Sequence, residues 1–173
     1  MLNLSGVKIR RRARPPRQLY PSSVEMYYRA GLLDYVRRLR KIIDDETKKY
    51  LPLIESELRA ERMDSWADSV PLMMRIIRKQ FDIMKKATVP LIETTADRVS
   101  NFELNQWRKT TRSLIGIELY SAEPWLRGQI EAFTQQNVEQ IAQLTDDLAA
   151  QINTIVSTGF RQGKRHETIR NEI

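Results

Sequence analysis

The sequence predicts an all-α fold: an elongated bundle of about five to seven amphipathic helices, preceded by an extended Arg-rich N-terminal arm. Apolar residues recur at three- and four-residue spacings along most of the chain, which is the period of a helix that packs on one face. No segment shows the apolar–polar alternation of a convincing β-strand. The net charge of +7 is concentrated in the first 24 residues, which hold six basic side chains and no acid.

The composition restricts the class of protein. A chain of 173 residues suits one domain, or a domain with an appendage, and 41% hydrophobic with 29% charged residues is ordinary for a globular protein. The chain has no cysteine, which excludes a disulfide framework and a cysteine-based metal site. No run of about 18 apolar residues is present, so we expect no membrane span.

Residues 1–21 form the predicted extended basic arm. They include Pro15, Pro16 and Pro21 and show no helical period, so the arm alone should be extended. Its candidate partner-binding residues are Lys8, Arg10, Arg11, Arg12, Arg14 and Arg17. Arginine predominates, which suits bidentate pairing with phosphate or carboxylate. The arm is therefore predicted to dock on DNA or on an acidic protein surface, and the alternative is a solvated tail.

Residues 22–115 form the predicted helical body. Ser22 and Glu25 have the spacing of a capping box, and the helix that they open should end near Lys49. Its apolar stripe consists of Tyr28, Leu32, Tyr35, Val36, Leu39, Ile42 and Ile43. A second, weaker helix is expected over about residues 54–66.

Two helices marked by proline are predicted in the rest of the body. Ser69 should cap the first of them, with Pro71 tolerated in its first turn. Its apolar stripe consists of Val70, Met73, Met74, Ile77, Phe81 and Met84. Pro90 should interrupt this helix and start another that runs toward Leu114.

Residues 116–173 contain the last predicted helices. Gly116 should end the preceding helix, and Pro124 suits the first turn of the next. Thr145 and the two acids after it are expected to start a further helix, because acids are favoured at the positive end of a helix. Gly163 should end that helix, and a last helix should begin near His166.

No residue pattern predicts an enzyme, a cofactor or a metal site. His166 is the only histidine, has no serine or cysteine partner nearby in sequence, and is interpreted as a cap or surface residue. The pairs Asp44–Asp45 and Asp146–Asp147 are interpreted as surface residues, since neighbours on a helix point about 100° apart. The pairs Met73–Met74 and Tyr27–Tyr28 are interpreted as core packing. Phosphate-binding glycine loops, HExxH zinc motifs and nucleophile elbows are absent from the sequence.

The segments "SLIGIELYSAEPWLRGQIEAFTQQNVEQIAQL" and "IVSTGFRQGKRHETIRNEI" contain a family pattern. A helix stop precedes a loop and a proline–tryptophan start, a helix then ends in an asparagine–valine element, and a last helix closes with two glycines. The residues of this pattern are Gly116, Pro124, Trp125, Asn137, Val138, Gly159 and Gly163. Over about residues 96–173 the chain resembles the phage minor head (head morphogenesis) proteins of the Mu F-like family.

The chain departs from the family pattern in two ways. Relatives have a serine–isoleucine–proline turn after the asparagine–valine helix, whereas this chain has "AQLTDD". Relatives also continue into a basic, partly β-containing end. We therefore expect residues 116–173 to be a Mu F-like helical segment truncated at its C-terminus.

The resemblance implies a bacteriophage virion protein, made in the host bacterial cytoplasm and bound inside the head near the portal vertex. It implies several copies per virion, the multi-subunit portal ring as partner, packaged DNA as a second partner, and no membrane. The role would be capsid head assembly, DNA packaging or DNA ejection. Two alternatives stay open from the residues: a DNA-binding architectural protein, and the helical carrier part of a longer enzyme or toxin.

Overall fold

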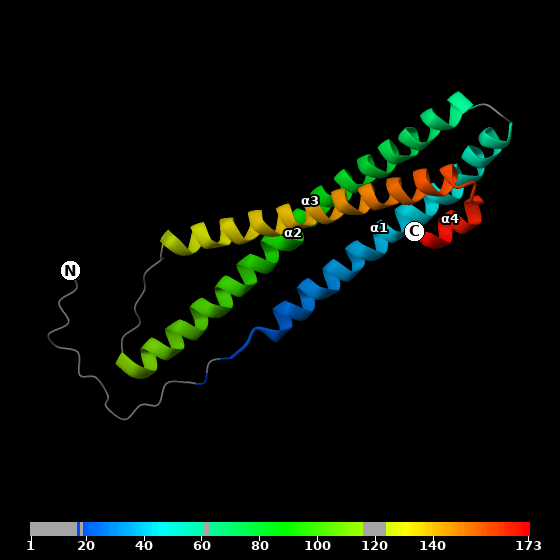
Figure 1. Ribbon diagram of the computed structural model, residues 1–173. Coiled ribbons are helices and arrows are strands. Elements are labelled where there is room, and N and C mark those ends of the chain that lie inside the picture. The colour runs from blue at the N-terminus through cyan, green and yellow to red at the C-terminus, as the bar shows by residue number, and fades with distance from the viewer. Residues whose placement is uncertain (1–16, 18, 61–62, 116–123) are drawn as a thin grey trace. The chain divides into compact units, whose positions relative to one another are not determined.

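The structure is a computed structural model that describes residues 17, 19–60, 63–115 and 124–173. Within these residues the chain is all-α and contains no strand, which confirms the predicted fold class. Four helices follow one another along this part of the chain (Figure 1). They are α1 (Ser22–Arg59), α2 (Met63–Ile115), α3 (Pro124–Arg161) and α4 (His166–Glu172).

The prediction of five to seven helices is wrong, because the described residues form four. Three prolines account for most of the difference. The first helix does not end near Lys49 but continues through Pro52 to its end at Arg59. Pro71 and Pro90 both lie inside α2, which runs through them without a break. Segments predicted as separate helices are therefore parts of single, longer ones.

Each interior proline lies on the exposed side of its helix. A proline in a helix interior costs about 3 kcal/mol, partly because one carbonyl loses its hydrogen bond. Here that carbonyl is on a side open to water. The buried neighbours are Leu51 and Ile54 beside Pro52, Val70 and Met73 beside Pro71, and Ile92 beside Pro90. Packing next to each proline offsets the local cost and keeps the helix continuous.

Two residues predicted to start helices, Ser69 and Thr145, lie inside helices instead. The Ser69 hydroxyl donates to Glu57 Oε2 of α1 at 2.8 Å. Thr145 is buried, and its hydroxyl is shared between the carbonyls of Ile141 and Ala142 one turn earlier. A hydroxyl that is satisfied within its own helix can lie on a buried face without an unpaired polar group.

The chain divides into two compact units, and the division cuts across the three long helices. The first unit comprises Met1–Ala30 and Pro90–Gln135, and the second comprises Gly31–Val89 and Gln136–Ile173. The buried side chains described in the first unit are few and include small and polar ones. They are Val24, Ile92, Thr95, Ala96, Ser100 and Thr111.

The second unit has the larger core, to which all four helices contribute. The predicted α2 stripe is confirmed: Val70, Met73, Met74, Ile77 and Phe81 are buried. The other helices contribute Tyr35, Leu39, Ile43, Leu51, Ile54, Ile141, Ile152, Val156, Phe160 and Ile169. Burial of an aliphatic side chain of this size contributes about 1.5–3 kcal/mol, so this core is the main source of stability. Val36 was also expected on an apolar face, but it is 51% exposed.

Candidate functional site

The C-terminal end of the predicted arm, residues 1–21, is attached to α2 within the first unit. The Leu19 amide donates to Gln106 Oε1 at 2.8 Å, and Gln106 Nε2 donates to the Leu19 carbonyl at 2.6 Å. The side-chain amide of Gln106 thus satisfies both backbone hydrogen-bonding groups of Leu19. Further along, the Arg98 guanidinium lies 4.0 Å from the centre of the exposed Tyr27 ring, within cation–π range.

The predicted arm residues are described only at their C-terminal end. Arg17 is exposed and precedes the Leu19–Gln106 pairing by two residues. Lys8, Arg10, Arg11, Arg12 and Arg14 lie outside the described residues. The role of the arm in binding stays a prediction. The pairing at Leu19 shows that the last part of the predicted arm contacts α2 in the first unit.

The residues that carry the Mu F-like pattern lie in α3 and in the turn that follows it. Gly116 is the exception, because it lies outside the described residues. Pro124 is the first residue of α3, as predicted, and Trp125 follows it. Asn137 and Val138 are half-buried in the middle of α3. The expected end of the helix near this element is therefore wrong, because α3 continues through it into the core of the second unit.

Gly159 and Gly163 shape the turn from α3 to α4. Gly163 has φ +70°, a left-handed conformation that favours glycine. Its amide donates to the Phe160 carbonyl at 3.0 Å, and the Lys164 amide donates to the Gly159 carbonyl at 2.9 Å, which is a Schellman motif. A Cβ added at Gly159 would lie 2.6 Å from Cγ1 of Ile169. The predicted helix end at Gly163 is confirmed. Gly163 is required by its left-handed backbone, and Gly159 by its close contact with Ile169.

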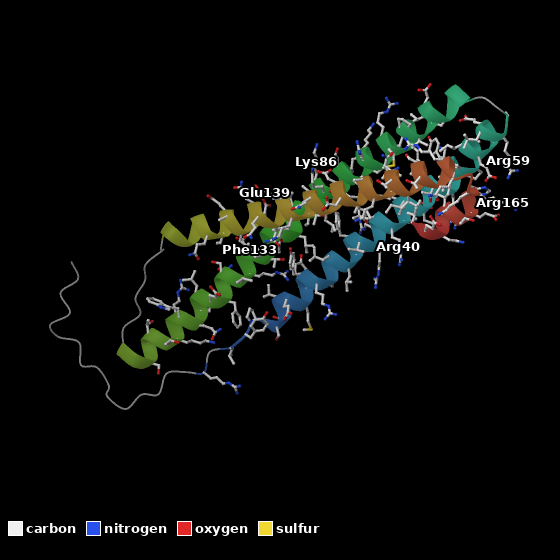
Figure 2. All side chains as sticks on the ribbon, viewed as in Figure 1. Arg40, Arg59, Lys86, Phe133, Glu139 and Arg165 are labelled. Atoms are coloured by element: carbon white, nitrogen blue, oxygen red, sulfur yellow. The ribbon has the colours of Figure 1, made fainter. Side chains whose placement is uncertain are left out.

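α4 lies beside α1 (Figure 1), and the carboxylate of Glu55 holds the two helices together. The His166 backbone N–H donates to Glu55 Oε2 at 2.9 Å, and the His166 ring Nδ1 is hydrogen-bonded to the same oxygen. Arg59 pairs with the other oxygen, at the end of the unit where Figure 2 labels Arg59 and Arg165. Glu55 thereby binds the first free N–H of α4, a group that a residue of the same helix usually caps.

A second ion pair ties α4 to α1 further along. Arg170 Nη2 of α4 lies 3.2 Å from Asp44 Oδ1 of α1, and Asp44 also pairs with Lys48. Lys164, which precedes α4, pairs through its Nζ with Glu172 Oε1 at 2.6 Å. Asp44 was interpreted only as a surface residue, and it is partly exposed as expected, but it also makes this contact between helices. The hydrogen bond from Lys48, with the charges of Lys48 and Arg170, lowers the pKa of Asp44.

The contact between Glu55 and His166 was not predicted. His166 is half-buried, and its partner lies 111 residues earlier, so nothing in the local sequence indicates the pair. The N–H of His166, then its ring, lowers the pKa of Glu55, while partial burial opposes that effect and the Arg59 charge assists it. The two hydrogen bonds of His166 to Glu55 thus join α4 to α1.

Glu55 should make stability depend on pH. Because the pKa of Glu55 is lowered by folding, the folded chain binds fewer protons than the unfolded chain below the ordinary value of about 4.3. The stabilisation is complete above about pH 4.3 and is lost as the pH falls through the lowered value. We expect the free energy of unfolding of Glu55→Gln, measured in urea, to fall less than that of the wild type between about pH 6 and pH 3.

The matched control is Asp45→Asn, which removes an exposed carboxylate of α1 that makes no ion pair within the described residues. Its pH dependence should follow that of the wild type. If all three proteins lose the same free energy on acidification, Glu55 does not contribute in this way.

Neither a metal-binding cluster nor a membrane-spanning helix is found in the described part of the chain. No group of three or more His, Asp or Glu residues is placed there to hold a metal ion. No helix described there is both long and apolar enough to cross a bilayer. Comparison with protein-family models, curated proteins and solved structures gives no match to this chain.

Proposed function

We propose that the chain is a non-enzymatic minor head protein of a bacteriophage, of the Mu F-like type. It is bound to the portal inside the capsid, in several copies per virion, and supports head assembly, DNA packaging or DNA ejection. Its cationic arm is the anchor, and the arm binds an acidic surface of the portal ring or the packaged DNA.

The structural role of two family-like glycines is the observation that carries this proposal. Gly163 adopts a backbone conformation that other residues rarely take, and Gly159 faces Ile169 where a Cβ has no room. Both glycines of the pattern thus lie where the turn between α3 and α4 requires glycine. Their placement supports the interpretation of the C-terminal part as a folded segment of the Mu F-like kind.

The distribution of charge supports the anchoring role of the arm. Six basic residues and no acid precede Glu25, whereas the rest of the sequence is nearly neutral. An exposed ion pair contributes about 0.2–1 kcal/mol, so an arm with six cations binds through several weak contacts. Such binding weakens with salt and favours a partner that presents repeated negative charges, as a ring of portal subunits or a DNA duplex does.

Replacing Arg10, Arg11, Arg12 and Arg14 with alanine in the phage is expected to lower the number of copies in purified heads by about fivefold or more. The reason is the loss of several weak contacts at once, each within the usual range for exposed pairs. Quantitative mass spectrometry, with the portal subunits as internal standard, measures the copy number.

The control replaces four exposed cations of the body, Arg37, Arg40, Lys41 and Lys86, which removes the same charge. Arg40 and Lys86 stand out from α1 and α2 (Figure 2). This variant should be incorporated normally. A normal copy number for the arm variant would contradict the anchor, and absence of the wild-type chain from heads would contradict the proposed function.

The six arm cations, with no acid among them, also favour the second candidate, a DNA-binding architectural protein. That protein would shift duplex DNA without any portal, and six phosphate contacts would give a salt slope of about −5. A gel-shift titration at two salt concentrations, with purified portal present or absent, distinguishes the two candidates.

A further inference from the structure

The second unit has an open groove of about 500 Å³ between α2 and α3. Pro71 and Met74 supply its apolar surface, and Asn153 of α3 lines it with an amide. The charged side chains that line it are Arg75, Arg78, Lys79 and Asp82, all from α2. The groove is thus apolar in part, with cations along one wall.

The three cations of this groove have no acidic partner within the described residues. Arg75, Arg78 and Lys79 are exposed, and Asp82, the nearest acid on their face, pairs with Lys85 at 3.5 Å. Their i, i+3, i+4 spacing places them on one side of the helix, where like charges repel by about 0.2–0.5 kcal/mol per pair. Negative charges from another molecule would relieve this repulsion.

We propose that this groove binds an acidic helical segment of a partner protein, whose carboxylates pair with Arg75, Arg78 and Lys79. Carboxylates at i, i+3 and i+4 on the partner helix have the same spacing as the three cations. Arginine binds a carboxylate with two parallel hydrogen bonds, and their fixed geometry adds specificity to the electrostatic attraction. This surface is separate from the arm, so the inference stands independently of the proposed function.

Two features of the groove favour a protein segment over a nucleic-acid backbone. Pro71 is exposed and offers apolar surface that side chains of a helix can cover, whereas a phosphodiester backbone has no comparable apolar group. The Asn153 amide can both donate and accept hydrogen bonds, as a peptide requires.

Binding can be measured with the full chain by fluorescence polarisation. The probe is a fluorescein-labelled, capped helical peptide with glutamates at i, i+3 and i+4 and one leucine on the same face, compared with the same peptide carrying glutamines. We expect the glutamate peptide to bind in a one-to-one complex and the glutamine peptide to bind at least about tenfold more weakly. The variant Arg75→Ala/Arg78→Ala/Lys79→Ala should lose at least about tenfold in affinity for the glutamate peptide.

The chain provides a matched control for this variant. Arg37, Arg40 and Lys41 of α1 have the same residue types at the same spacing, are exposed and unpaired in the described part of the chain, and do not line the groove. Replacing these three with alanine removes the same charge and should change the affinity by less than about twofold. Circular dichroism and urea unfolding verify that both variants are folded.

Four results would overturn the proposal: no binding of the glutamate peptide to the wild type, equal binding of the glutamine peptide, equal loss in the two triple variants, or preference for a different anion. For the last, a 20-base-pair duplex DNA is titrated in parallel. If it binds more tightly than the peptide and is lost with the groove variant, the groove takes phosphates instead. If the groove variant loses peptide affinity but is incorporated into heads normally, the groove is a binding site for acidic helices that is not needed for head incorporation.

Discussion

Replacing Ile169 with alanine is expected to lower the free energy of unfolding by about 3 kcal/mol. Ile169 is 0% exposed, and it is the buried residue of α4. A helix of seven residues is too short to be stable alone, so loss of this contact should release all of α4. The contacts of His166 with Glu55 and of Arg170 with Asp44 require the same docking and should weaken together.

Urea unfolding and amide hydrogen exchange test this expectation. Exchange in α4 should become faster in Ile169→Ala, while the amides of α2 around the buried Ile77 should remain protected until global unfolding. Ile173→Ala is the control, because that residue is 37% exposed and the substitution should cost less than about 0.5 kcal/mol. Unchanged exchange in α4 would contradict the anchoring role of Ile169.

Replacing Gly159 with alanine should also destabilise the protein, by about 1–3 kcal/mol. Helix propensity alone predicts the opposite, a gain of about 1 kcal/mol, because alanine is a better helix former than glycine. The new Cβ, however, would lie 2.6 Å from Cγ1 and 2.9 Å from Cδ1 of Ile169. Ile169 is fully buried and branched at Cβ, so it cannot turn away without displacing α4.

Gly128 offers the matched control within the same helix. Nothing lies within 4 Å of a Cβ added there, so Gly128→Ala should stabilise the protein by up to about 1 kcal/mol. The double variant Gly159→Ala/Ile169→Ala should lose less than the sum of the two single losses, because truncation of Ile169 removes the clash. Additive losses, or a gain in stability from Gly159→Ala, would show that the turn can accept a side chain at this position.

The sequence was informative where the structure depends on residues a few positions apart. The all-α class and the buried stripe of Met73, Met74 and Ile77 follow from the period of a helix, which repeats within one or two turns. The start of α3 at Pro124 and the left-handed Gly163 follow from backbone rules that act at single residues. The charge of the arm is likewise a property of composition alone.

The same local rules failed where packing opposed them. Pro52 and Pro90 were predicted to lie at breaks between helices, and Thr145 was predicted to start a helix. In the structure, buried neighbours such as Leu51 and Ile92 hold the helices together across the prolines. Each such contact is comparable in free energy to the local cost of the proline, and its partner is distant in sequence.

The candidate site also has some features that follow from local sequence and others that depend on tertiary packing. The sequence by itself determined a helical chain with six cations near its start and a glycine-dependent turn near its end, because charge, period and backbone conformation are local properties. Only the tertiary structure decided that His166 of α4 meets Glu55 of α1 and that Asn153 faces the α2 cations across a groove. Those pairs are brought together by the burial of apolar side chains far apart in the sequence, and no local pattern records which distant residue will be the neighbour.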